Sequence, residues 1–120
     1  MKTLKVGIVS REAYKKRTLA IAKGEYVPPK NEPKIWFESL ATLTQVLSDQ
    51  NRALLKLILE TRPQSLQELA DKSGRATSNL SRTLRTMERY GLVHFEHGPN
   101  RQLVPQVNYS GVELELPFQG

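Results

Sequence analysis

The sequence predicts a mainly α-helical fold with a small amount of β structure. Apolar residues recur every three or four positions through much of residues 33–89, which is the spacing of one buried helix face. Near both ends of the chain, and again after residue 93, apolar and polar residues alternate as they do in strands. We therefore expect an N-terminal strand–helix extension at residues 1–27, a linker at 28–33, a mainly helical domain at 34–107 and a C-terminal strand tail at 108–120.

The N-terminal extension carries signals for both of its elements. Leu4, Val6 and Ile8 share one face of residues 2–9, so this segment is expected to be a strand. Ser10 is a suitable N-cap for a helix that runs to about residue 23 and ends at Gly24. The proline-rich segment that follows, residues 28–33, has the composition of a linker.

Two helices are expected after the linker. Trp36, Leu40, Leu43 and Leu47 recur at helical spacing and predict a helix over residues 33–47 with a narrow apolar seam. This seam would either pack into the core or join two subunits. The next helix, residues 48–61, has leucine or isoleucine on nearly every side, so we expect it to be buried all round at the centre of the domain.

Residues 65–93 then predict two helices joined by a glycine-containing turn. Ser65 and Glu68 have the spacing of a capping box, and Gly74 stands where a left-handed residue would end the first helix. In the second helix, Leu80, Leu84 and Met87 mark one buried side. The opposite side carries Ser78, Arg82, Arg85 and Arg89. No acid is expected to face these arginines, because Glu88 projects nearer the buried side.

A β-hairpin is expected directly after the second helix. Residues 94–96 and 102–107 have strand patterns, and Gly98 and Pro99 favour a turn between them. A helix-turn-helix followed by such a hairpin is a winged helix-turn-helix. The run from Leu54 to Val107, with its segment SNLSRTLRTMERYGLV, resembles the winged-helix domain of MarR- and ArsR-type transcriptional regulators. The whole chain is also similar to small predicted regulators that accompany toxin genes as antitoxins.

This resemblance implies that the second helix enters the major groove of double-stranded DNA. Its early residues would read bases, and its arginines would contact bases or phosphates. The wing tip would touch the neighbouring minor groove or its phosphates. The expected DNA-binding residues are Arg75, Thr77, Ser78, Asn79, Ser81, Arg82, Arg85, Arg89 and, at the wing tip, Arg101.

The charge of the chain also favours a polyanionic partner. The formal net charge is +6, and residues 1–34 alone hold nine lysines and arginines against three glutamates, an excess of the same size. The basic helix at residues 11–23 is therefore either an ordinary solvated surface or an arm that contacts DNA phosphates beside the recognition helix.

The C-terminal tail alternates in the same way as the first strand. Val112, Leu114, Leu116 and Phe118 share one face of residues 111–118. A strand that exposed four large apolar side chains would be an aggregation hazard, so it needs a partner. The unpaired segment at residues 2–9 matches it in length, and the two could pair within one subunit or between two.

Several classes of function are disfavoured by the sequence. There is no cysteine, no glycine-rich phosphate loop and no serine elbow, and His94 and His97 would point to opposite faces of a strand. We therefore expect no enzyme activity, no metal and no cofactor. No apolar run approaches the length of a membrane span and no signal peptide opens the chain, which favours a cytoplasmic location.

Three hypotheses for function follow. The first is a dimeric, sequence-specific repressor with its own operon as one candidate target, whose subunit contact would be the Trp36 seam. The second is a protein-interaction module such as an antitoxin that neutralises a partner toxin, with DNA binding secondary. The third is an RNA binder, which is disfavoured because the major groove of duplex RNA is too deep and narrow for a helix, and the basic helix face offers no stacking aromatics.

Overall fold

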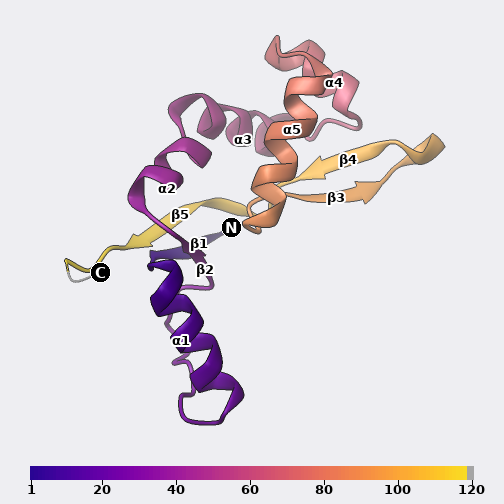
Figure 1. Ribbon diagram of the computed structural model, residues 1–120. Helices are drawn as coiled ribbons and strands as arrows, with labels where there is room; N and C mark the ends of the chain where they lie inside the picture. Colours follow the sequence, from indigo (N-terminus) through magenta and orange to yellow (C-terminus); the bar gives the residue numbers. More distant parts are fainter. Residues whose placement is uncertain (119–120) are drawn as a thin grey trace.

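The computed structural model describes residues 1–118 and shows a mixed fold of five α-helices and two small sheets within that part of the chain (Figure 1). In chain order the elements are β1 (Lys2–Ile8), α1 (Arg11–Ala22), β2 (Ile35–Phe37), α2 (Leu40–Val46), α3 (Asp49–Thr61), α4 (Leu66–Ser73), α5 (Thr77–Arg89), β3 (His94–His97), the short 3₁₀ helix η1 (Pro99–Arg101), β4 (Leu103–Gln106) and β5 (Tyr109–Glu115). None of the helices described is long and apolar enough to span a membrane.

The larger sheet joins the two ends of the chain. Its strand order is β2-β1-β5, and both neighbours of β1 run parallel to it. Leu4 pairs with Val112 and Val6 with Leu114. The predicted pairing of the first strand with the C-terminal tail is therefore confirmed, and it forms within a single chain. As the central strand, β1 buries Leu4 and Val6 almost completely.

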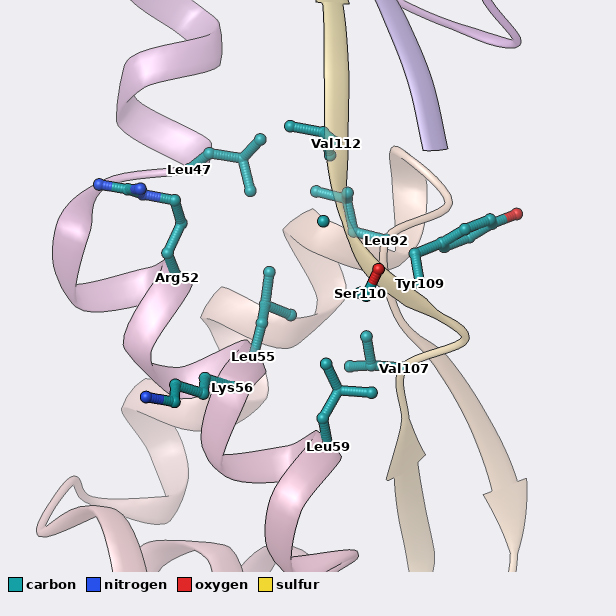
Figure 2. Close-up of a pocket in the computed structure, with 11 residues that line it drawn as sticks. Leu47, Arg52, Leu55, Lys56, Leu59, Leu92, Val107, Tyr109, Ser110 and Val112 are labelled. Atoms are coloured by element: carbon teal, nitrogen blue, oxygen red, sulfur yellow. The ribbon is translucent and has the colours of Figure 1, made fainter. Parts of the chain in front are cut away.

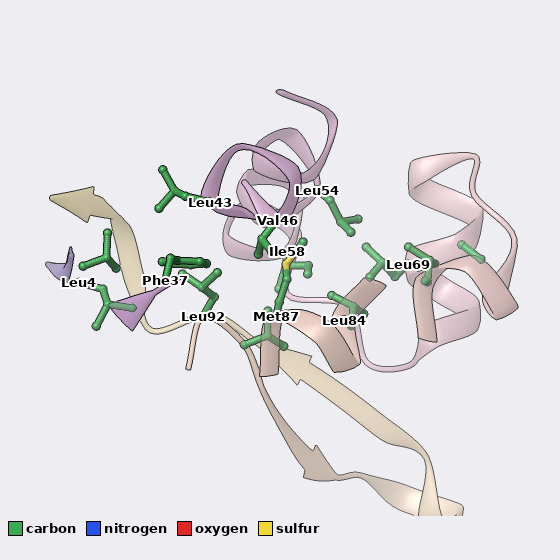
Figure 3. Close-up of a cluster of buried hydrophobic side chains, with 14 residues drawn as sticks. Leu4, Phe37, Leu43, Val46, Leu54, Ile58, Leu69, Leu84, Met87 and Leu92 are labelled. Atoms are coloured by element: carbon green, nitrogen blue, oxygen red, sulfur yellow. The ribbon is translucent and has the colours of Figure 1, made fainter. Parts of the chain in front are cut away.

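One apolar core connects this sheet to the helices. In Figure 3 the buried side chains run from Leu4 and Phe37 at the sheet, past Val46, to Leu69 and Leu84 in the helices. Phe37 stacks on Tyr90 with ring centroids 4.3 Å apart. Since the N-terminal strand and the helices share this core, residues 1–27 are not a detachable extension.

The predicted helix over residues 33–47 is wrong in its first half. Residues 35–37 form strand β2, and the helix begins only after Ser39, whose Oγ accepts the Thr42 N–H at 3.1 Å. Ile-Trp-Phe is a strongly strand-forming triplet, and the free side of β1 offers it backbone partners, so pairing outweighs the helical spacing. Trp36 therefore covers Gly7 of the sheet and is not part of a helical seam.

Helix α3 has the predicted bounds but not the predicted burial. Leu54 and Ile58 are buried, whereas Leu55 and Leu59 are half-buried and line a cleft beside β5. The burial all round that its leucines predicted is thus wrong, because only one side of α3 faces the other helices.

Helix α1 projects from the sheet, and none of its residues is buried (Figure 1). Ser10 caps it as predicted, since its Oγ accepts the Ala13 N–H at 3.1 Å. The segment expected to be a linker folds back on this helix: Arg17 donates to both carboxylate oxygens of Glu32 at 2.9 and 3.0 Å. The side chains of this ion pair are only 22% and 13% exposed, so the loop is fixed to α1.

Candidate nucleic-acid interface

Helices α4 and α5 are positioned by the signals that their sequence carries. The Ser65 Oγ accepts the Glu68 N–H at 3.0 Å and begins α4. The Glu68 carboxylate accepts the N–H of Gln64, one residue before the cap. Gly74 ends α4 with a φ of 74°, a left-handed conformation that favours glycine. This turn redirects the chain into α5.

Helix α5 has one buried side and one exposed side, as predicted. Leu80, Leu84 and Met87 are buried against the core. The opposite side is exposed and holds Ser78, Arg82, Arg85 and Arg89. A helix held by its apolar side therefore presents hydroxyl and guanidinium groups outward.

The first turn of α5 leaves its backbone donors open. Ala76 occupies the N-cap position and makes no side-chain hydrogen bond, whereas α1 to α4 each begin with a capping serine. Thr77, Ser78 and Asn79 are exposed in this turn. Free N–H groups at the positive end of a helix dipole attract anions such as phosphate. The turn thus combines backbone and side-chain donors on one surface.

Arg82 and Arg89 extend outward from α5 into solvent. The Arg89 Nη2 donates to the Thr86 Oγ1 at 3.4 Å, a weak contact on the same helix. Within residues 1–118, Arg82 forms no ion pair that would compete with an external anion. Arg82 is therefore the most available guanidinium on this face.

Arg85 is placed differently from the prediction. Its Nη1 lies 3.1 Å from the Glu88 Oε1, and its Cζ lies 4.7 Å from the centre of the Phe95 ring. The expectation that no acid faces the arginines is therefore wrong, because residues three apart on a helix are neighbours and Glu88 leans toward Arg85. Arg85 contacts both its own helix and the hairpin, so it is an oriented group on this surface.

Arg75 and Ser81 are half-buried at the edge of the exposed side of α5. The Arg75 Nη1 donates to the Asn51 Oδ1 at 3.3 Å. Asn51 in turn donates from Nδ2 to the Val46 carbonyl at 3.0 Å, which fixes both side chains. This pair belongs to a polar cleft of about 680 Å³ beside α5. The cleft is lined by Gln45, Ser48, Gln50, Asn51, Arg75, Asn79 and Thr83.

The residues before and in α3 that line this cleft were not found from the sequence. Gln45, Gln50 and Asn51 have no pattern that distinguishes them from other polar surface residues. The only local signal was Ser48, which caps α3 by accepting the Asn51 N–H at 3.2 Å.

The hairpin formed by β3 and β4 follows α5 directly. The strands are antiparallel, and His94 pairs with Gln106 and His97 with Leu103. Arg101 is exposed at the tip, where Asn100 and Arg101 have φ values of 60° and 62°. In Figure 1 the hairpin extends outward from the base of α5, so its tip is separated from the helix. No cluster of three metal-ligating side chains occurs in the part of the chain that the structure describes.

The basic helix α1 does not lie beside α5. Figure 1 places α1 at one end of the molecule and α4 with α5 at the other, with the larger sheet between them. Of the two alternatives for this basic helix, an arm beside α5 is thus not supported by its position.

Comparison with known proteins places this chain in a family. The chain belongs to the family described as HVO_A0114, whose model matches residues 46–114, more than half of its length. The match covers α3 to α5, the hairpin and most of β5, and leaves out β1, α1 and β2. Searches among curated proteins and among solved structures found no similar protein.

Proposed function

We propose that this protein is a sequence-specific DNA-binding transcriptional regulator with a winged helix-turn-helix. In this proposal α4 and α5 are the helix-turn-helix, α5 is the recognition helix, and the β3–β4 hairpin is the wing. The observation that carries it is the division of α5, with Leu80, Leu84 and Met87 buried on one side and a row of serine and arginine side chains exposed on the other. The resemblance to MarR- and ArsR-type regulators agrees with this arrangement.

The arrangement divides the DNA contacts between bases and phosphates. The first turn of α5 would enter the major groove, where Ser78, Asn79 and Arg82 reach base edges. The open N–H groups of that turn and the Arg75 side chain beside it would bind phosphates. Arg101 would contact the backbone next to the site through the hairpin tip. The protein would act as a repressor by occupying its operator as a dimer, with one recognition helix for each half-site.

A gel-shift titration tests this proposal. The probe is the DNA upstream of the protein's own coding sequence, and a scrambled duplex of the same length is the competitor. Arg82→Ala should weaken binding to the specific probe by about 1–3 kcal/mol if Arg82 reads a base, and should leave unfolding unchanged because the side chain is exposed. Lys15→Ala is the matched control: it also removes one exposed cation, but from α1, which lies at the other end of the molecule.

Two outcomes of this titration would contradict the proposal. Equal affinity of the wild type for the two duplexes would contradict sequence-specific binding, and equal losses in the two variants would assign the affinity to net charge alone.

One observation favours a second candidate function, neutralisation of a partner protein such as a toxin. Tyr14, Leu19 and Ile21 of α1 are exposed, as is Val27 in the loop that follows. A projecting helix with exposed apolar side chains suits a protein contact better than a phosphate contact. Co-purification with the product of the neighbouring gene tests this function. Leu19→Glu should abolish that complex, whereas Arg82→Ala should leave it intact.

A further inference from the structure

Strand β5 has a free edge. The strand order β2-β1-β5 places it at the end of its sheet, with β1 on one side and no strand of the described chain on the other. The backbone N–H and C=O groups on that side are available to a further strand, which is the usual route by which exposed edges associate.

An apolar cleft lies next to this edge. Figure 2 shows Leu55 and Leu59 of α3 facing Val112 and Ser110 of β5 across it, with Leu47 at one end. Its volume is about 540 Å³. A second cleft of about 310 Å³ shares Leu59 and Val107 with the first.

The end of the chain supplies apolar side chains that its own fold leaves uncovered. Leu114 and Leu116 are 39% and 44% exposed, and Phe118 is fully exposed. Val112 and Leu114 share one face of β5, with Glu113 between them, and Leu116 and Phe118 follow the end of the strand. The chain therefore carries both an apolar cleft and an apolar strand end that cannot fill its own cleft.

We propose that β5 is the contact between two copies of this chain, pairing antiparallel with the partner's β5 about a two-fold axis at Val112. This deepens the proposed function, on which it rests, because it names the surface that would couple two recognition helices. In this register Val112 faces the partner's Val112, Gly111 faces the partner's Glu113 and Ser110 faces the partner's Leu114. All residues of β5 then have a partner, and no carboxylate is directly opposite another.

Charge disfavours the symmetric registers with an axis nearer the C-terminus, whereas an axis at Gly111 would set Leu114 and Glu115 opposite residues outside β5. Moving the axis by one residue to Glu113 would place two like charges directly opposite each other, and moving it to Leu114 would set Glu113 against the partner's Glu115.

The register also fills the clefts. Directly opposite residues of an antiparallel pair lie on the same face of a sheet, so the partner's Leu114 would enter the cleft beside the small side chain of Ser110. The partner's Leu116 would follow opposite Asn108, which lines the second cleft, and the partner's Phe118 would continue along it. By symmetry, both clefts of both copies receive a strand end.

Single-cysteine variants test this contact, because the chain contains no cysteine of its own. Side chains directly opposite in an antiparallel pair have Cβ atoms about 4.5–5.5 Å apart, near the span of a disulfide. Val112→Cys should therefore give a disulfide-linked dimer under mild oxidation of the full chain. Val27→Cys, at an exposed site on the loop after α1, is the control and should stay monomeric. A mixture of Gly111→Cys and Glu113→Cys should cross-link more than either variant alone.

Sedimentation of the unmodified chain and of Ser110→Lys completes the test. Ser110 is exposed in one copy, so lysine there should leave the helical content unchanged while lowering the mass from dimer to monomer. A monomeric wild type at tens of micromolar, or cross-linking of Val112→Cys no greater than that of Val27→Cys, would overturn the proposed contact. A cross-linked dimer that binds no DNA would overturn the proposed function and retain the contact.

Discussion

The guanidinium of Arg85 in α5 lies 4.7 Å from the centre of the Phe95 ring in β3. This cation–π contact joins the helix proposed to read DNA to the hairpin proposed as its wing. The Nη1 atom of the same guanidinium also lies 3.1 Å from the Glu88 Oε1. The angle between α5 and the hairpin is therefore stabilised by a side chain that also belongs to the exposed basic row.

Arg85→Ala should reduce both stability and DNA binding, unlike Arg82→Ala. The lost cation–π contact is worth about 0.5–1 kcal/mol at an exposed site. Urea unfolding measures the loss of stability, and the gel shift measures the loss of DNA affinity. Glu88→Gln is the control, because it removes the ion pair and keeps the stacking on Phe95. An Arg85→Ala variant with unchanged stability would show that the contact does not brace the hairpin.

Gly7→Ala should destabilise the protein through Trp36. A Cβ at position 7 would come within 2.6 Å of the Trp36 ring, which is too close for any real contact. Overpacking of this kind typically costs about 1–3 kcal/mol in urea unfolding. In a Trp36→Leu background the same substitution should cost much less. Equal costs in the two backgrounds would contradict the close packing of the indole on β1.

The contact between α1 and its following loop should be sensitive to acid. The Arg17 guanidinium, by hydrogen bonding and then by charge, lowers the pKa of Glu32 below its ordinary value. Because the pKa of Glu32 is lower in the folded state, its ionised carboxylate stabilises the fold at any pH above the unfolded-state pKa of about 4.3. This stabilisation is lost as the pH falls through the pKa that Glu32 has in the folded state. The Arg17 Cζ lies 5.3 Å from the centre of the ring of Trp36, the only tryptophan. The fluorescence of Trp36 should therefore change as Glu32 is protonated. Glu32→Gln should remove this transition, and its persistence would assign the change to another group.

Charge removal on α1 should leave the salt dependence of DNA binding unchanged, because α1 lies away from α5. If Lys15 and Lys16 both contacted phosphates, replacing them with alanine would reduce the slope of log K against log salt by about 1.8. We expect no such reduction in the double variant. A reduction of that size would show that α1 also reaches DNA.

Deleting residues 1–34 is not a suitable test of the same question. It would remove β1 with its buried Leu4 and Val6, and should unfold the sheet.

The elements with local signals could be predicted from the sequence. Ser10, Ser48 and Ser65 each cap the helix that was expected to follow, and Gly74 ends α4 as expected. The buried and exposed sides of α5 could also be predicted, because apolar residues spaced three or four positions apart lie on one helix face. The pairing of β1 with the tail could be predicted because each strand had an apolar face and neither had another partner.

The features that depend on distant contacts could not be predicted. Trp36 fits a helical spacing equally well, and only the free side of β1 makes its segment a strand. Arg85 lies over Phe95 only because the tertiary fold sets the start of the hairpin beside α5. Arg75 meets Asn51 across 24 positions of sequence. No local sequence pattern indicates these contacts, because each of them forms only in the tertiary fold.

The parallel pairing of β1 with β5 also determines when the fold can be completed. During synthesis β1 emerges long before β5, the later of its two partner strands, which begins only at Tyr109. The helices between β1 and β5 are stabilised by contacts that are close in sequence, so we expect them to form early. Pairing of β1 with β5 is slower, because it must close the long chain segment between the two strands. On a ribosome, β1 could therefore pair with β2 while its other edge stays open, and a message truncated before Tyr109 would yield helices beside an incomplete sheet.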